Sequence, residues 1–575
     1  MIPHTEREAG VPHRHHFLVV LLLAAYVVIG YWGALTLPFI NDDYFFLDKI
    51  RQASFFDLWK PERLYFQWYR PWSRELHYWF LSRLFGHREV AYHAISFGLW
   101  LTVAVLYFRL VERLSGERFT SAVALTGMAA LTLWAGPLFW VAGVQDLWMV
   151  LFGLLFLHAV VAGRHLLVSL PLALALLSKE TAAVLPAIGA AYLRLVARQS
   201  WSSAFRRSSG HWVLLACWGL LHPTLRTRLF TPGREFIETA YRPSWPEALT
   251  RTVLSQVNLD QWPWPETGWP RALLIGALTA VVLLALLFVA SRRAPSKTTL
   301  ARESQVLRFG AVWAILGWAV LLLPSIGWHP YYGVLGTLGC WVVIGVVLTR
   351  HRKAGVAVVA CLALLRAARA DTPSWDWGTD WYQYRAGSLL GAIRERLFHY
   401  HTTLRPRSRL FFARLPNNIG LLAGDGPAIR IWYDDPSLVA MYYSAYTPRA
   451  PHDSMGADYF FRFDTVQVLV EVRQGPEPLR TAIQQNPDWQ RDHDVLASLF
   501  IHAGNVRAAA GEYAKLARAF PNRPDYSLYA GAAYEAMGRA AEARDFYRAA
   551  ARSYGDTLVR ERATALLRAL PSSVP

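Results

Sequence analysis

Two adjacent carboxylates follow the first apolar run of the chain, in the segment 38–44. One of them, Asp42 or Asp43, could take the proton of an acceptor hydroxyl, and the other could orient that hydroxyl or hold a cation. Successive side chains diverge, so the two need not point into one site. The alternative is a helix cap, in which Asn41 or Asp42 binds the free N–H groups of a helix that begins near Tyr44. The residue types leave both interpretations open.

Two arginines come next, in the segment 69–77. Arg70 and Arg74 are four residues apart, so on a helix they would share a face. A guanidinium fork is suited to binding phosphate. The alternative is an amphipathic interfacial helix whose arginines meet lipid headgroups.

Three further loops carry ionisable residues. Asp146 lies at the predicted outer end of an apolar run, where an ionisable group is costly and usually functional. Lys179 and Glu180 separate two apolar runs, and their alternative role is to cap a tight turn. His329 and Tyr331 stand in another short loop. Because four short loops place Asp, Arg, Lys and His at one predicted depth, we expect a shared outer pocket.

Predicted membrane spans position these loops. Apolar residues make up 54% of the 575 residues, charged residues only 17%, and there are 25 Trp. This composition excludes a disordered chain and disfavours a single soluble domain. A span needs about 20 largely apolar residues. Such runs lie near 17–39, 92–111, 121–141, 147–162, 165–178, 181–197, 211–223, 271–291, 309–325, 332–349 and 354–368. The shortest could be re-entrant or tilted, so we predict about eleven spans.

Basic residues are concentrated in alternate loops. The whole chain has a net charge of +18. If the N-terminus is cytoplasmic, the inside segments are 1–16, 109–120, 163–165, 194–210, 292–308 and 350–353, and they hold 18 Lys and Arg against 5 Asp and Glu. This asymmetry explains the basic charge without a nucleic-acid partner. It predicts an integral protein, at what we expect to be a bacterial inner membrane, with its C-terminal region in the periplasm.

The C-terminal region divides into two parts. Residues 371–490 resemble a small α/β domain, with strands near 409–412 and 465–470 and turns at 417–418 and 434–436. From about 493 a 34-residue period pairs small and aromatic positions: Gly504 with Gly538, Ala509 with Ala543, Tyr513 with Tyr547, Ala517 with Ala551 and Phe520 with Tyr554. This period resembles tetratricopeptide repeats. The alternative is an Ala-rich helical hairpin without repeat identity.

The repeats are few. Two repeats and a capping helix near 557–570 fall below the number usually needed for independent stability. We therefore expect them to lean on the preceding domain, and to bind a peptide or protein partner or to act as a spacer. The predicted domains are 1–370, 371–490 and 491–575.

The order of these motifs resembles a known family. An acidic pair after the first span, followed by the segments 69–71, 140–146 and 177–181, is similar to GT-C-fold glycosyltransferases that use polyprenyl-phosphate sugars. The last three segments resemble the branch that adds C-terminal tetratricopeptide repeats, which includes the transmembrane O-mannosyltransferases and bacterial relatives. The resemblance covers roughly 20–350 and the repeats, and leaves 371–490 unexplained.

The resemblance implies an inverting hexosyltransferase. Its donor would be a lipid-linked sugar, and Asp42 or Asp43 would be the base or a metal ligand. The sequence also departs from the family pattern. Trp134 and Gly136 stand where members often carry His and Glu, and Val144-Gln145 stands where an Arg commonly precedes the Asp.

These observations predict a polytopic α-helical, GT-C-like membrane protein with an extracytoplasmic α/β segment and C-terminal repeat helices. It would move a sugar from a polyprenyl-phosphate donor to a hydroxyl of a protein or envelope glycan at the outer face. The predicted site has catalytic Asp42, Asp43 and Asp146, phosphate-binding Arg70, Arg74 and Lys179, and supporting Glu180, His329 and Tyr331. No cofactor is assigned; a divalent cation, if one is used, would bind Asp42 or Asp43. The alternative function is a non-catalytic membrane scaffold or assembly factor that recruits partners through its repeats.

Overall fold

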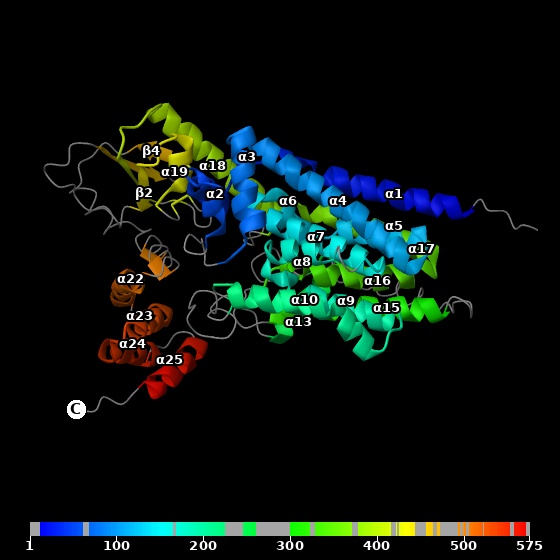
Figure 1. Ribbon diagram of the computed structural model, residues 1–575. Helices are drawn as coiled ribbons and strands as arrows, with labels where there is room; N and C mark the ends of the chain where they lie inside the picture. Colours follow the sequence, from blue (N-terminus) through cyan, green and yellow to red (C-terminus); the bar gives the residue numbers. More distant parts are fainter. Residues whose placement is uncertain are drawn as a thin grey trace, which may run out of the picture. The chain divides into compact units, whose positions relative to one another are not determined.

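The computed structural model describes residues 12–60, 68–164, 168–223, 225, 245–259, 300–322, 328–370, 378–413, 415, 421–422, 425–442, 456–463, 469–471, 493–494, 497, 500–501, 505–520, 523–552 and 557–570 (Figure 1). They form two compact units. The first holds the described residues within Met1–Phe39, Gln52–Pro232 and Arg242–Arg385. The second holds those within Ile40–Arg51 and Ala386–Pro575. A short piece of the N-terminal region, Ile40–Arg51, therefore belongs to the unit formed by the C-terminal region.

Helices build the first unit. Its α-helices are α1 Pro12–Gly30, α3 His77–Phe85, α4 Glu89–Ser115, α5 Arg118–Ala129, α6 Ala135–Phe139, α7 Val144–Val161, α8 Ser169–Leu176, α9 Leu185–Leu195, α10 Trp201–Leu221, α13 Trp245–Ser255, α15 Leu300–Trp318, α16 Val334–Thr349 and α17 Arg352–Ala370. Between them lie the π-helix η4 Pro71–Leu76 and short 3-10 helices, of which η8 Glu180–Val184 and η10 Pro330–Gly333 matter for the site. The helix α18 Asp380–Tyr400 begins in this unit and ends in the second.

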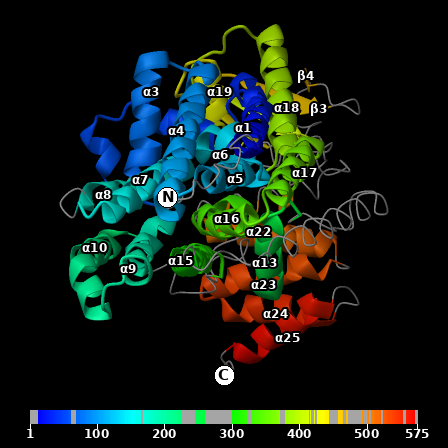
Figure 2. The ribbon, with the colours of Figure 1, turned by 90° about the vertical axis from the view of Figure 1, so that its right-hand side faces the viewer.

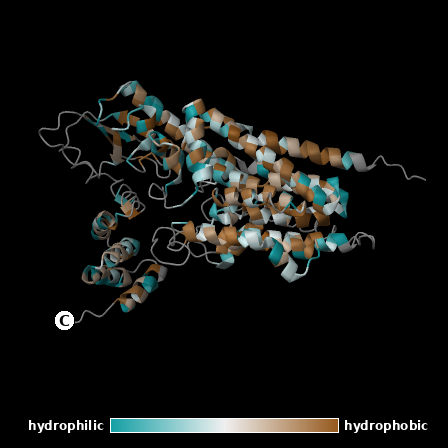
Figure 3. Ribbon diagram, viewed as in Figure 1, coloured by the Kyte–Doolittle hydropathy of each residue, from teal (hydrophilic) through white to brown (hydrophobic). Residues whose placement is uncertain are grey.

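Among the described residues, five helical segments are long and apolar enough to cross a membrane: His15–Thr36, Glu89–Ser115, Val141–Val161, Arg302–Leu322 and Pro330–Thr349. Arg118–Ala129 and Thr132–Phe139 form a sixth candidate, bent by 60°. Figure 3 shows how apolar α1 is along its length. Large apolar side chains such as Leu22 and Ile29 are exposed on it, as expected of a surface that faces lipid. The chain is thus an α-helical membrane protein.

The number of spans stays a prediction. Each predicted apolar run contains a helix, except 271–291, which lies outside the described residues. However, α8 and α9 have only 8 and 11 residues. At about 1.5 Å per residue, neither can cross a hydrocarbon core of roughly 30 Å alone. The residues Lys179 and Glu180 therefore lie at a break between two short helices.

Arginines at the ends of several helices lie together at one end of the first unit. Arg352 forms an ion pair with Glu117 at 2.6 Å, and Arg350 forms one with Glu303 at 2.6 Å. Arg302 Nη2 donates to the carbonyl oxygen of Arg113 at 2.9 Å. These contacts join the end of α4, the start of α5, the start of α15 and the junction of α16 with α17. Three loops that the sequence analysis assigned to the same side thus meet.

The helix α17 runs from this basic end to the opposite one. It begins at Arg352, beside the start of α5, and reaches Arg366, whose Nε donates to the Tyr31 hydroxyl at 3.1 Å. That hydroxyl in turn donates to the carbonyl oxygen of Ala129 at the end of α5. Arg366 also forms a buried ion pair with Asp380 at the start of α18. The C-terminal region therefore leaves the first unit at the end opposite the basic loops.

A reporter experiment tests this topology. A periplasm-active reporter fused after Pro575 should be active, and the same reporter fused after Gly116, at the end of α4, should be inactive. A cytoplasm-active reporter should give the opposite pattern at both positions. Activity of the cytoplasmic reporter after Pro575 would place the C-terminal region inside and overturn the assignment.

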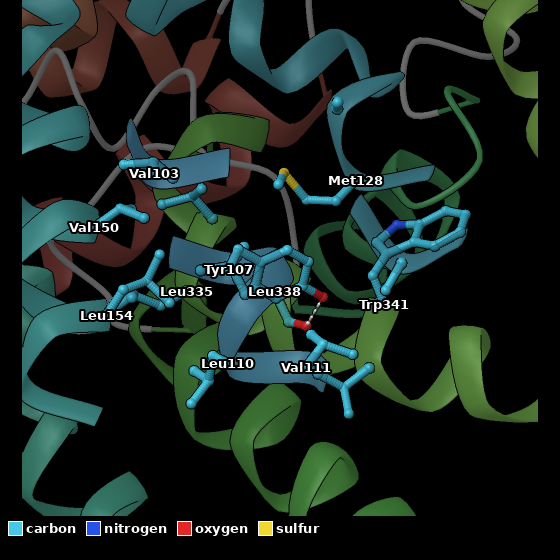
Figure 4. Packing of buried hydrophobic residues seen from close by; sticks show 14 of the residues in the cluster. Val103, Tyr107, Leu110, Val111, Met128, Val150, Leu154, Leu335, Leu338 and Trp341 are labelled. Atoms are coloured by element: carbon cyan, nitrogen blue, oxygen red, sulfur yellow. Dashed lines mark hydrogen bonds between the residues drawn. The ribbon is translucent and has the colours of Figure 1, made fainter. Parts of the chain in front are cut away.

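Small residues allow α15 and α16 to pack closely. A Cβ on Gly317 would lie 2.2 Å from the backbone nitrogen of Gly336, and one on Gly339 would lie 2.6 Å from the backbone nitrogen of Ala314. Helices in a membrane commonly approach through such residues. Figure 4 shows the neighbouring core, where the Tyr107 hydroxyl donates to the carbonyl oxygen of Leu338 at 2.7 Å. This packing fixes α16, whose N-terminal end carries the tyrosines of the site.

The second unit contains a four-stranded sheet of order β2-β1-β3-β4. Its strands are β1 Arg409–Ala413, β2 Val439–Tyr442, β3 Asp458–Phe463 and β4 Leu469–Glu471. β1 is parallel to β2 and β3, and β3 is antiparallel to β4. The predicted strand at 409–412 and the turn at 434–436 are confirmed. The turn at 417–418 and the first part of the predicted strand 465–470 lie outside the described residues. Two short helices accompany the sheet, α2 Asp42–Ile50 and α19 Pro427–Trp432.

The described part of the C-terminal region from residue 505 onward holds four helices: α22 Val506–Ala519, α23 Pro524–Ala536, α24 Ala540–Arg552 and α25 Thr557–Ala569. Figures 1 and 2 show them stacked one after another. The periodic residues Ala509, Tyr513, Ala543 and Tyr547 are buried between them. The predicted capping helix near 557–570 is present as α25, whereas Gly504 lies outside the described residues. The identity of the helices as tetratricopeptide repeats stays a prediction.

Candidate active site

A buried ion pair lies between α7 and the break after α8. Asp146 is in the first turn of α7, and Lys179 directly precedes η8. The Lys179 Nζ lies 2.6 Å from both carboxylate oxygens of Asp146. The side chains are only 4% and 2% exposed. The ammonium also lies 4.6 Å from the ring centroid of Tyr332 and 5.3 Å from that of Tyr331, a cation–π arrangement.

A second ion pair lies beside the first. Arg70 Nη2 is 2.6 Å from Glu180 Oε2, and Arg70 Nε donates to the same oxygen at 2.8 Å. Arg70 Nη1 donates to Gln145 Oε1 at 2.8 Å, and Gln145 precedes Asp146 in the chain. His222 Nε2 lies 3.4 Å from Glu180 Oε1. The two pairs therefore form one buried network, which we call the charge network: Arg70, Gln145, Asp146, Lys179, Glu180 and His222.

The charge of Arg70 sets the state of Glu180. Burial alone would raise the pKa of the Glu180 carboxyl. The neighbouring guanidinium and hydrogen bonds from His222 and Arg70 outweigh burial and lower that pKa to about 2. Glu180 is therefore ionised at any physiological pH, and it keeps Arg70 in a defined orientation.

The π-helix η4, which directly follows Arg70, is bonded to the segment that precedes Lys179 and Glu180. Ser73 Oγ donates to the carbonyl oxygen of Ser178 at 2.7 Å, and the Trp72 N–H donates to that of Leu177 at 3.3 Å. Pro71 fits the first position of η4, where no backbone donor is needed. Because the segment 177–178 is clamped to η4, the residues that follow it, Lys179 and Glu180, are fixed next to Arg70.

The other predicted cation takes a different partner. Arg74 is buried in η4, where its Nη2 lies 2.6 Å from Glu75 Oε1 and donates to the carbonyl oxygen of Trp68 at 2.6 Å. Each of the three predicted phosphate-binding cations is thus paired with a carboxylate in the fold. A phosphate group would have to share these cations with Glu75, Asp146 or Glu180.

Tyr331 and His329, two of the predicted supporting residues, lie in the loop beside the Asp146–Lys179 pair. Tyr331 is in η10, which precedes α16, and its ring faces the Lys179 ammonium. The His329 ring stacks on the Tyr331 ring at 5.4 Å, with 16° between the planes. The loop 328–333 therefore covers one side of the Asp146–Lys179 pair.

The predicted acidic pair belongs to the second unit. Helix α2 begins at Asp42, and Asn41 before it has a positive φ of 46°. The Asp43 carboxylate accepts a hydrogen bond from the Ile40 N–H at 2.9 Å, and the Asp43 N–H donates to the Ile40 carbonyl oxygen at 3.0 Å. Asp43 is fully buried, whereas Asp42 is half-buried. Asp43 therefore has a local structural role, whereas Asn41, at the N-cap position, makes no side-chain capping hydrogen bond.

Sequence reasoning missed two members of the charge network, Gln145 and His222. Gln145 stands next to Asp146, and its side-chain oxygen accepts from Arg70 while its nitrogen donates to the Ala142 carbonyl oxygen. His222 directly follows α10, as its C-cap residue. Only its place at the end of an apolar run could have indicated that it belongs to the site. Among the described residues, no group of three or more His, Cys, Asp or Glu is arranged to hold a metal ion.

Comparison with known proteins gives a distant structural likeness. No family model matches the sequence, and no curated protein does. The crystal structure of ArnT from Cupriavidus metallidurans bound to undecaprenyl phosphate matches with a TM-score of 0.42 and 14% identity, over 74% of this chain and 85% of that chain. The structure of the same ArnT in the apo state matches with a TM-score of 0.41 and 15% identity, over the same shares of the two chains.

Proposed function

We propose that this chain is a GT-C-type membrane glycosyltransferase that moves a sugar from a polyprenyl-phosphate donor to a hydroxyl acceptor. The charge network is the observation that carries the proposal. Removing the cations Arg70 and Lys179 and their two carboxylate partners largely from water, beside apolar helices, is expensive. A scaffold needs no such network, because apolar side chains would stabilise the same helix junctions at least as well.

The chemistry assigns roles to the acidic pair and to two of the three predicted phosphate-binding cations. The acceptor oxygen attacks the anomeric carbon, and its proton passes to the carboxylate of Asp42 or Asp43. The bond from the anomeric carbon to the phosphate oxygen breaks, and the electron pair leaves with polyprenyl phosphate. Cations stabilise the charge that develops on that leaving group. Arg70 and Lys179 supply them, and their carboxylate partners hold them in position while the site is empty.

Asp146 takes a supporting role in this proposal. The sequence analysis listed it among the catalytic residues, but both of its oxygens bind Lys179. We therefore assign it the orientation of Lys179 instead of proton transfer. Glu180 acts in the same way on Arg70. The inner-membrane location, the outer-face acceptor and a partner for the terminal helices remain parts of the proposal.

A transfer assay tests the function and the scaffold alternative together. Purified full-length protein, supplied with a polyprenyl-phosphate sugar and a small hydroxyl acceptor, should release polyprenyl phosphate and form a glycoside. A chain truncated after about residue 490 should keep this reaction, because all predicted catalytic residues precede the truncation. It should lose use of the natural acceptor if the terminal helices bind that acceptor as their partner. A glycan comparison of wild-type and deletion cells identifies that acceptor. A folded, full-length protein inactive with every polyprenyl-phosphate hexose tested would favour the scaffold.

A further inference from the structure

The helix that carries the acidic pair is attached to the α/β segment. Asp48 of α2 accepts two hydrogen bonds from Arg430 of α19, from Nε at 2.9 Å and from Nη2 at 2.8 Å. Tyr44, one turn earlier, accepts a hydrogen bond from Trp432 Nε1 at 3.0 Å. The two rings also pack edge to face, 5.7 Å apart at 89°.

A third connection lies at the end of α2. Arg51 forms an ion pair with Asp434 and donates to the carbonyl oxygen of Arg430 at 3.4 Å. We call the contacts of Tyr44, Asp48 and Arg51 with α19 and Asp434 the α2 clasp. All of its members belong to the second unit. The clasp therefore joins a segment from the N-terminal region to a domain that begins more than 300 residues later.

The clasp is partly shielded from water. The side chains of Asp48 and Arg430 are 19% and 13% exposed. The apolar residues Phe45, Phe46, Leu47 and Ile50 of α2 are buried, as are Ile429 and Ile431 of α19. Two guanidinium nitrogens that meet one carboxylate oxygen, over a packed apolar contact, restrain orientation as well as distance. Tyr44 and Asp48 are four residues apart, so they share one face of α2 and hold it against α19.

This arrangement fixes the backbone of the acidic pair. Asp42 and Asp43 are the first two residues of α2, and Asp43 is tied locally to Ile40. A rotation or shift of α2 would move both carboxylates together. Catalytic groups are sensitive to such shifts, since a displacement of about 1 Å can lower a rate roughly 100-fold.

We infer that the α/β segment is a positioning module for the reaction: through the α2 clasp, it sets the place and orientation of the Asp42–Asp43 pair. The inference rests on the proposed function for the role of that pair. It gives a purpose to the part of the chain that the family resemblance left unexplained. Asp48, Arg430, Tyr44 and Trp432 are the positioning residues, and none of them is assigned a contact with substrate.

The test uses full-length protein with three single substitutions. Asp48→Asn keeps the shape of the side chain but removes the charge that Arg430 binds. Asp48→Glu keeps the charge. Asp57→Asn is the matched control, because Asp57 lies in the short 3-10 helix Phe56–Trp59, pairs with Lys60 at 2.7 Å and is not a member of the clasp. For each protein, kcat and the KM for the polyprenyl-phosphate sugar are measured, together with amide hydrogen exchange of the peptide that spans 40–50.

We expect Asp48→Asn to lower kcat at least 10-fold, with the KM for the donor unchanged within 2-fold, and to speed exchange in the 40–50 peptide but not in α7. Asp48→Glu should recover most of kcat, and Asp57→Asn should match wild type. A wild-type kcat and wild-type exchange in Asp48→Asn would overturn the inference. So would equal losses in Asp48→Asn and Asp48→Glu, or faster exchange throughout the protein, because these indicate a general loss of structure.

The outcomes separate this inference from the proposed function. If wild-type protein transfers no sugar, the proposed function fails. If exchange in the 40–50 peptide then still depends on Asp48, the α/β segment does hold α2, and the positioned pair serves another reaction. If wild-type protein is active and Asp48→Asn changes neither kcat nor exchange, the inference alone fails.

Discussion

Substitution of Asp42 by Asn should lower the rate of sugar transfer by roughly 100- to 10,000-fold, the usual contribution of a general base. Asn has nearly the same shape and can remain at the first position of α2, so the protein should stay folded. Asp42 is the stronger candidate for the base because it is half-buried, whereas Asp43 is fully buried and binds the Ile40 N–H. The measurement is a single-turnover transfer assay with purified protein in detergent.

Asp43→Asn is the informative comparison. Its side-chain oxygen can still accept the hydrogen bond from Ile40, so a purely structural role for Asp43 predicts a folded and largely active protein. Loss of activity in both single variants, with normal folding, would mean that the pair acts as a unit. Full activity in both single variants and in the double variant would show that the base assignment is wrong.

The second large effect concerns stability. Lys179→Met leaves the Asp146 carboxylate buried without its cation, and Asp146→Asn leaves the Lys179 ammonium without its anion. Breaking one side of a buried pair typically costs about 3–5 kcal/mol, because the remaining charge is not compensated. Each single variant should therefore unfold at a markedly lower temperature in detergent, as measured by loss of helical circular dichroism.

The double variant Asp146→Asn/Lys179→Met is the control for this effect. It removes both charges, so it should recover most of the lost stability while transfer stays impaired. Arg109→Ala is a second control, since Arg109 is 63% exposed in its pair with Glu112 and should contribute about 0–1 kcal/mol. If Lys179→Met is as stable as wild type, the pair is hydrated in solution and the charge network does not carry the proposed function.

Periodicity and charge predicted the helices of the first unit but not the pairing of its charged residues. The apolar runs around 92–111 and 332–349 could be predicted because lipid requires a continuous apolar surface and internally bonded backbone. By contrast, Asp146 pairs with a residue 33 positions away and Arg70 with one 110 positions away. Such pairings depend on how the helices pack against one another, and the spacing of residues in the sequence does not predict that packing.

Arg74 is a local case in which residue spacing did not indicate the partner of a side chain. Its spacing from Arg70 predicted a shared helical face, yet Arg70 precedes η4 and Arg74 lies within it, paired with its own neighbour Glu75. A π-helix changes the angular spacing of side chains, and the sequence 69–77 gives no sign of one. The terminal helices were easier to predict from the sequence. Their small and aromatic residues recur with a fixed period, as expected of residues that pack between successive helices.

The α2 clasp has a consequence for how the chain is made. Arg430 follows Asp48 by 382 residues, so α2 is synthesised long before the helix that covers it exists. At about 5–20 residues per second, α2 waits roughly 20–80 s for α19. Throughout that interval its apolar face has no native partner in the second unit. Contacts of such sequence separation form late, because a long loop must close before they contribute. Completion of the acidic segment is therefore a late step of folding, and α2 stays without its native partner helix until the chain around α19 has been synthesised and has folded.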